Sequence, residues 1–213
     1  MNGIFITGSN TEVGKTTVAI EIARRLSEDR KVRARKPVES DCPIVGTKFA
    51  PRDAIALSEA CGDNEALSAV CPYCFELEAS AEKASSEAGT SLGLEQLVAA
   101  CKQNTGNDFV LVEGAGGFYS PIAERVLNAD LASALNLPLV VVVRDELGAI
   151  SQALLTIEAA HKNNLKVACV VLNRIENNTL SNLEALKAYT KVPLVGFSLV
   201  DLDRFWVDIK GLI

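Results

Sequence analysis

The chain has 213 residues, of which 48% are hydrophobic and 23% are charged, a composition typical of a globular domain. Its formal net charge of −6 disfavours nucleic acid and anionic membrane surfaces as partners, because both repel an acidic protein. The sequence shows no signal-type N-terminal segment and no apolar stretch of the roughly 20 residues that span a bilayer. We therefore expect one domain, residues 1–213, located in the cytoplasm.

Apolar runs rich in β-branched residues alternate with helical patterns along the chain. We predict strands at Ile4–Thr7, Val32–Lys36, Phe109–Glu113, Leu139–Val143, Val167–Leu172 and Leu194–Phe197. We predict helices at Lys15–Glu28, Arg52–Cys61, Ser80–Glu87, Leu94–Gln103, Ala129–Leu135, Ala149–Asn163 and Leu180–Tyr189. The segments Ser40–Thr47 and Gly62–Glu78 are expected to be loops. Buried strands that alternate with helices favour a doubly wound α/β fold, a mainly parallel sheet with helices on both faces.

The first predicted strand and helix are joined by a glycine-rich loop. Residues 8–17 read Gly-Ser-Asn-Thr-Glu-Val-Gly-Lys-Thr-Thr, and a glycine loop with Gly-Lys-Thr in this position is typical of a phosphate-binding loop. Its first glycine, Gly8, lies one position earlier than the common pattern requires. Backbone N–H groups of such a loop bind phosphate. The loop predicts a P-loop NTPase-like fold, with nucleotide contacts from Glu12, Val13, Gly14, Lys15, Thr16 and Thr17.

Polar residues that follow the other strands are further candidates, because ligands of doubly wound sheets bind beyond the carboxyl ends of the strands. Lys36 would place a second cation beside the phosphates, and the alternative is a solvated lysine. Glu113, which precedes a run of glycines, is a candidate ligand of Mg²⁺ together with the Thr16 hydroxyl. Asp53 is either a third ligand or a helix cap. Asn173 either pairs with adenine or forms a turn.

The six cysteines are scattered, and we expect all of them to be reduced. Cys71 and Cys74 have the C-x-x-C spacing of redox and metal motifs. They do not open a helix after the first strand, as thioredoxin-like sites do, and a zinc site would need more ligands. The only histidine, His161, is distant in sequence, which also disfavours histidine acid–base chemistry. We interpret the spacing of the two cysteines as incidental.

These motifs resemble those of the dethiobiotin synthetases in their identity and order. The segments that carry the resemblance are Gly8–Thr16, Lys36–Ser40, Arg52–Leu57, Cys71–Phe75, Val112–Gly117 and Leu147–Thr156. They cover nearly the whole chain, and the early glycine is part of the longer phosphate loop of that family. The family has Asn-Pro-Tyr-x-Phe at Cys71–Phe75, which agrees with an incidental cysteine pair.

The resemblance implies an enzyme of biotin biosynthesis that uses ATP and Mg²⁺. Its substrates would be CO₂ and a small-molecule diamine, 7,8-diaminopelargonate. One amine would become a carbamate, which would attack the γ-phosphate to give a carbamic-phosphoric anhydride. The second amine would close the cyclic urea of dethiobiotin and release phosphate. Members of the family are homodimers, with the substrate tail near the interface.

The resemblance also implies roles for individual residues. Lys15 and Lys36 would be catalytic, and Mg²⁺ would be held by Thr16, Asp53 and Glu113. Nucleotide contacts would include Gly116 and Asn173 in addition to the phosphate loop. Substrate contacts would come from Thr11, Ser40, Ser80, Gly148, Ile150 and Ser151. Three departures from the family concern the tail and base pockets: the segment Ala79–Glu82, Ser151 in place of asparagine, and the segment Gly196–Leu199.

Two alternatives remain open. A diverged relative acting on another diamine would keep the phosphoryl-transfer residues and change the tail pocket. A regulatory ATPase of the ParA/MinD kind would share the loop, but its signature lysine is replaced by Asn10. No amphipathic membrane-targeting tail is evident in the sequence.

Overall fold

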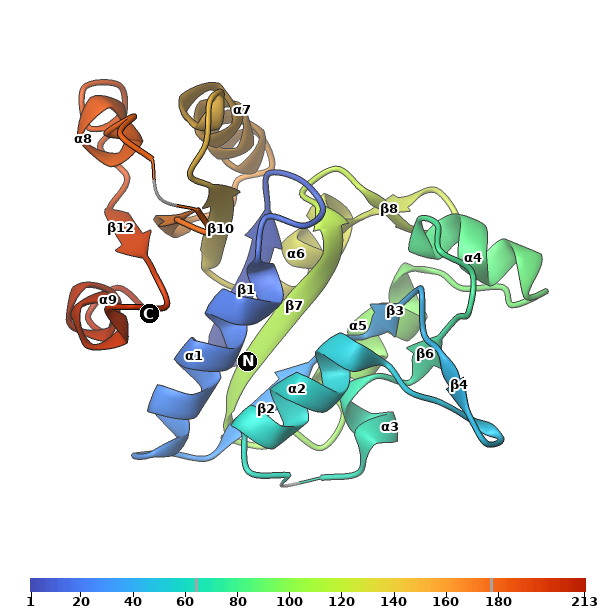
Figure 1. The fold of residues 1–213 in the computed structure, drawn as a ribbon. Coiled ribbons are helices and arrows are strands. Elements are labelled where there is room, and N and C mark those ends of the chain that lie inside the picture. The colour runs from blue at the N-terminus through green and yellow to red at the C-terminus, as the bar shows by residue number, and fades with distance from the viewer. Residues whose placement is uncertain (64, 177) are drawn as a thin grey trace.

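A computed structural model describes residues 1–63, 65–176 and 178–213. Within these residues, the core of the molecule is a six-stranded parallel sheet in the order β12-β11-β10-β1-β7-β2 (Figure 1). The strands are β1 (Gly3–Gly8), β2 (Val32–Arg35), β7 (Phe109–Gly117), β10 (Leu139–Arg144), β11 (Val167–Asn173) and β12 (Leu194–Phe197). The predicted doubly wound α/β fold is confirmed.

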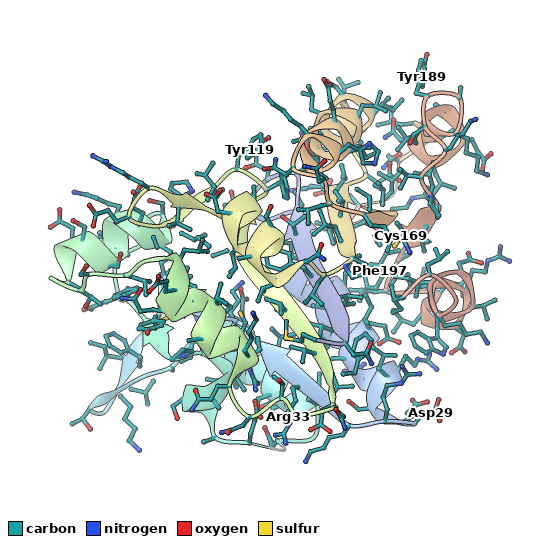
Figure 2. All side chains as sticks on the ribbon, turned by 180° about the vertical axis from the view of Figure 1, so that it is seen from behind. Asp29, Arg33, Tyr119, Cys169, Tyr189 and Phe197 are labelled. Carbon is teal, nitrogen blue, oxygen red and sulfur yellow. The ribbon has the colours of Figure 1, made fainter. Side chains whose placement is uncertain are left out.

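Helices cover both faces of this sheet (Figures 1 and 2). One apolar core lies under α1 (Lys15–Ser27), α2 (Arg52–Ala60), α3 (Leu67–Val70) and α9 (Leu202–Ile209). The other lies under α4 (Ala81–Glu87), α5 (Leu94–Lys102), α6 (Asn128–Leu135), α7 (Ala149–Lys162) and α8 (Asn182–Leu186). Successive strand residues supply the two cores in turn, as Phe5 and Ile6 do, because strand side chains alternate between faces.

In the described part of the chain, three short strand pairs lie outside the central sheet. They are β3 (Val38–Glu39) with β6 (Tyr73–Cys74), β4 (Ile44–Val45) with β5 (Lys48–Phe49), and β8 (Pro121–Ala123) with β9 (Val126–Leu127). The β4–β5 hairpin is exposed and extends away from the sheet in Figure 1. The two predicted loops are therefore partly wrong, because Ser40–Thr47 contains β4, and Gly62–Glu78 contains α3 and β6. Position 64 of the second predicted loop lies outside the described residues.

The largest error of the sequence analysis is helix α9, which was not predicted. Asp201 caps this helix by accepting a hydrogen bond from Arg204 N, and Phe205 and Ile209 lie one turn apart on its buried face. The rings of Phe197 and Phe205 pack edge to face with centroids 4.8 Å apart, so that α9 is held against β12 (Figure 2). The capping residue Asp201 and the four-residue spacing of Phe205 and Ile209 were the sequence signals that could have predicted this helix.

Two other elements differ from the prediction by more than one residue at an end. Helix α8 begins two residues later than predicted because Ser181 has a left-handed φ of 51° and helical geometry begins only after it, and it ends at Leu186 instead of Tyr189. Strand β7 continues through Gly117 instead of ending at Glu113, since glycines allow its backbone to lie against the phosphate loop. A Cβ on Gly117 would lie 3.2 Å from Ser9 O. Among the described residues, no helix is both long and apolar enough to cross a membrane.

Candidate active site

A cavity of about 460 Å³ opens at the carboxyl end of β1, beside the phosphate loop. Most of its lining consists of residues that the sequence analysis selected. These are Thr11, Glu12, Gly14, Lys15, Thr16, Thr17, Lys36, Asp53 and Gly116. Ile175 also lines the cavity, and sequence reasoning missed it because an isolated apolar residue after a strand carries no chemical signal.

The phosphate loop is held in shape by Asn173. Gly14 has a left-handed φ of 87°, and a Cβ at this position would lie 1.9 Å from Asn173 Nδ2. The Asn173 amide is buried and donates a 2.9 Å hydrogen bond to Val13 O. Only glycine fits here, because the backbone is strained for other residues and the space is already occupied. The amide nitrogen of Asn173 thus supports the loop.

The floor of the cavity is an ion cluster centred on Lys36. Its ammonium group donates to Asp53 Oδ2 at 2.8 Å, to Glu113 Oε1 at 2.5 Å and to Gly114 O at 3.3 Å. Thr16 Oγ1 donates to the same Glu113 oxygen at 2.9 Å. Lys36 is only 3% exposed and Glu113 is fully buried, so the alternative of a solvated lysine is wrong.

The charges of this cluster are set by mutual contact. Burial lowers the pKa of Lys36, but Glu113 and Asp53 outweigh it and raise that pKa above its ordinary value. Burial raises the pKa of Asp53, but the contact with Lys36 outweighs it and holds that pKa below its ordinary value. Burial and the neighbouring charge of Lys36 lower the pKa of Lys15 to about 8, with Glu113 and Asp53 opposing them. Lys36 is therefore a permanent cation, and Lys15 beside it is a cation that titrates near neutral pH.

The donor set suits a magnesium ion that arrives with a nucleotide. The second carboxylate oxygen of Glu113, Oε2, is buried and finds no hydrogen-bond partner among the described residues. Such an orphaned oxygen beside the Thr16 hydroxyl and the Asp53 carboxylate matches the hard oxygen ligands of Mg²⁺. Within the described parts of the chain, no group of three or more acidic, cysteine or histidine side chains could hold a metal ion alone. Nucleotide-site Mg²⁺ uses one or two carboxylates and completes its shell with phosphates and water.

Except for Thr11, which lines the cavity, the predicted substrate residues lie outside its lining. The Ser40 hydroxyl donates to Ala79 O at 2.7 Å, and Ser80 Oγ caps α4 by accepting from Lys83 N. The α7 residues of this set begin that helix, with Gly148 at its N-cap; Ile150 is half-buried and Ser151 is exposed. The structure thus separates the predicted residues into a phosphate site and two flanking segments.

Glu39 supports the cluster from behind, and sequence reasoning missed it. Its two carboxylate oxygens accept hydrogen bonds from Asp53 N and Ala54 N, each at 3.0 Å, and so cap the start of α2. Asp53 is therefore free of the capping role that was its alternative interpretation. The cap comes from 14 residues away, and local sequence patterns do not show such pairs.

A second cavity of about 170 Å³ lies at the carboxyl ends of β11 and β12. Asp145, Arg174 and the segment Gly196–Ser198 contribute to its lining. Strand β10 lies between this cavity and the phosphate loop in the sheet order, and a place beyond the carboxyl ends of the strands suits the far end of an extended nucleotide.

Because the pKa of Lys15 is about 8 in the nucleotide-free protein, binding of MgATP at about pH 8.5 is expected to take up a proton. Phosphate charge raises the pKa of the ammonium group, so the deprotonated fraction gains a proton when ATP binds. Below about pH 7 the group is already protonated and this uptake disappears. Calorimetry in two buffers of different ionisation heat measures it. Lys15→Arg keeps the charge without titrating, and equal uptake by this variant would contradict the assignment.

The chain is similar to known proteins over nearly its whole length. The family described as an AAA domain matches residues 2–197. The ATP-dependent dethiobiotin synthetase BioD of Ruthia magnifica subsp. Calyptogena magnifica is 46% identical over 100% of this chain and 99% of its own length. The enzyme of the same name from Vesicomyosocius okutanii subsp. Calyptogena okutanii is also 46% identical, over 100% of this chain and 97% of its own.

A solved structure with a similar fold is a ParA family ATPase from Chlorobium tepidum TLS. It superposes with a TM-score of 0.57 and 13% identity, over 100% of this chain and 92% of that one. A likeness at this identity shows the fold and carries no activity with it. The two synthetases, in contrast, match the chain from end to end at 46% identity, and with them the ordered motifs around the ion cluster place this chain in the dethiobiotin synthetase family.

Proposed function

We propose that this chain is an ATP-dependent cyclo-ligase that joins CO₂ to 7,8-diaminopelargonate and closes the product to dethiobiotin, releasing ADP and phosphate. The observation that carries the proposal is the cluster in which buried Lys36 contacts Asp53 and Glu113 beneath the phosphate loop. The names of the two full-length relatives, ATP-dependent dethiobiotin synthetases, support the same activity.

The proposed reaction has three bond-forming steps. One amine of the substrate adds to CO₂ and loses a proton, which gives a carbamate. A carbamate oxygen then attacks the γ-phosphorus of ATP, and ADP leaves. The second amine attacks the carbamoyl carbon of the resulting anhydride, expels phosphate and closes the cyclic urea. Each intermediate is anionic, so positioning and charge stabilisation are the main requirements.

The residues of the cavity meet these requirements in the proposal. Lys15 and Lys36 stabilise the carbamate and the transferring phosphoryl group, and backbone N–H groups of the loop bind the phosphates. Thr16, Asp53 and Glu113 would hold Mg²⁺, which neutralises phosphate charge. Adenine would occupy the second cavity, beside Asn173.

The diamine would lie between the cavity and the flanking segments. Thr11, Ser40 and Ser80 would contact its amines or the carbamate, and the start of α7 at Gly148–Ser151 would bind its carboxylate tail, since a helix N-terminus attracts anions. We also propose a homodimer in the cytoplasm. Leu147 and Leu155 support it, because they are 87% and 64% exposed on either side of the tail segment. Sedimentation equilibrium, with twice the chain mass expected, tests the dimer.

The deciding experiment measures phosphate release from MgATP with ¹³C-bicarbonate and the diamine, and determines the product mass. We expect release to depend on the diamine and the cyclic urea to carry the labelled carbon. Diamines with shorter tails, or without the carboxylate, distinguish this substrate from another diamine. Phosphate release that needs no diamine and yields no cyclic urea would contradict the proposal and favour a regulatory ATPase.

A further inference from the structure

The turn between α3 and β6 brings two thiols together. Cys71 ends α3 and Cys74 lies in β6, and their Sγ atoms are 3.6 Å apart. A disulfide has an S–S length of about 2.05 Å, so the sulfurs need to approach by only about 1.5 Å. Cys71 is buried, whereas Cys74 is partly exposed and can be reached from solvent. The cysteine spacing that the sequence analysis set aside therefore has the geometry of a closable dithiol.

A direct chain of contacts links these thiols to the ion cluster. Cys74 pairs with Glu39 in the β3–β6 ladder, and Cys42 Sγ donates to Glu39 O at 3.3 Å. The Glu39 carboxylate in turn caps α2 at Asp53, and Asp53 accepts from Lys36. Figure 1 shows β3 and β6 side by side next to α2. Cys74 is thus connected to Asp53 through one strand pair and one helix cap.

We propose that Cys71 and Cys74 form a modification site, a reversible dithiol that low-molecular-weight disulfides oxidise, and that its closure slows turnover by displacing the Glu39 cap of α2. The thiolate of Cys74 attacks the small disulfide, forms a mixed disulfide and releases one thiolate. The Cys71 thiolate then attacks the Cys74 sulfur and releases the second. Two electrons pass from the dithiol to the small disulfide, and the two protons of the dithiol go to the released thiolates.

The reaction is slow at neutral pH. A hydrogen bond with Cys42 lowers the pKa of Cys74, but the hydrogen bond with Cys71 and burial outweigh it and raise that pKa to about 12. Since only the thiolate attacks a disulfide, oxidation takes hours and is run at about pH 8.5. The disulfide itself does not depend on the proposed function, whereas its effect on turnover does.

The test incubates the full-length protein with oxidised glutathione, maps its peptides by mass and measures dethiobiotin formation. We expect a Cys71–Cys74 disulfide, lighter by two hydrogen atoms, and a fall in turnover of about threefold or more, the lower range of coupling between packed groups. Reduced glutathione should restore both. Cys71→Ser and Cys74→Ser should keep their turnover under oxidant, and Cys169→Ser, which removes a buried thiol in β11, is the matched variant that should still respond.

Two outcomes would overturn the proposal. One is a glutathione adduct on Cys74 that never resolves to the internal disulfide. The other is a complete disulfide in the wild-type protein with unchanged turnover. If no cyclic urea forms even in the reduced protein, the proposed function fails, and MgATP affinity of the oxidised and reduced forms becomes the readout. A changed affinity then supports the link to Asp53, and an unchanged affinity refutes it.

Discussion

Replacing Lys36 by methionine is expected to lower the turnover number by about 10²- to 10³-fold, the usual loss when one preorganised charge donor is removed. The ammonium group lies in the floor of the phosphate cavity, 2.5 Å from Glu113 and 2.8 Å from Asp53. In the proposed mechanism it acts on charge that develops during phosphoryl transfer, so affinity for ATP should change far less than turnover. Single-turnover measurements and calorimetric titration with MgATP separate the two.

The same variant is expected to lose stability, and this loss needs its own control. Glu113 is fully buried, so without Lys36 it is an uncompensated charge that lowers the free energy of unfolding by about 3–5 kcal/mol. Lys36→Met/Glu113→Gln removes both charges and should recover most of that stability in urea unfolding without recovering turnover. Lys15→Met should instead weaken ATP binding. An equal loss of ATP binding in Lys36→Met and Lys15→Met would contradict the catalytic assignment.

The fold followed from the sequence where elements are long and their patterns are strong. Most of the sheet strands have continuous apolar runs because helices cover both of their faces. Strand β2 reads Val-Arg-Ala-Arg instead, and all six strands were predicted. The β3–β6 pair was not, since each strand is two residues long and has no period to detect. Its pairing depends on tertiary contacts such as that between Cys42 N and Phe75 O.

The sequence predicted which residues form the site from their chemical type, but not how they are arranged. Lys15 was selected from the Gly-Lys-Thr of the phosphate loop, and Lys36 and Glu113 because charged residues after buried strands need a reason to be there. Asp53 was selected at the start of a predicted helix. Their arrangement was not predictable, because Lys36 could equally have faced solvent until its contact with Glu113, 77 residues away, was seen. The supporting role of Glu39 was hidden for the same reason.

Replacing Glu113 by glutamine is expected to uncouple Mg²⁺ from ATP binding. The amide oxygen can still accept from Lys36 and Thr16, so the local geometry is retained, while the negative charge on the orphaned Oε2 is lost. In the wild-type protein Mg²⁺ should strengthen ATP binding, and in the variant this strengthening should fall by about tenfold, about 1.4 kcal/mol of coupling. Titrations with ATP, with and without Mg²⁺, measure the coupling without any turnover.

Thr16 offers the matched control for this prediction. Thr16→Ser keeps the hydroxyl that contacts Glu113 and should preserve the coupling, whereas Thr16→Val keeps the shape and should lose it. Valine and threonine have nearly the same shape and differ in the hydroxyl group, which can bind a metal ion. The two variants therefore separate a metal-ligand role of Thr16 from a packing role. Full Mg²⁺ coupling in both Glu113→Gln and Thr16→Val would mean that the metal is bound by the nucleotide alone. In that case the role of the buried Glu113 carboxylate would be to balance the positive charge of Lys36.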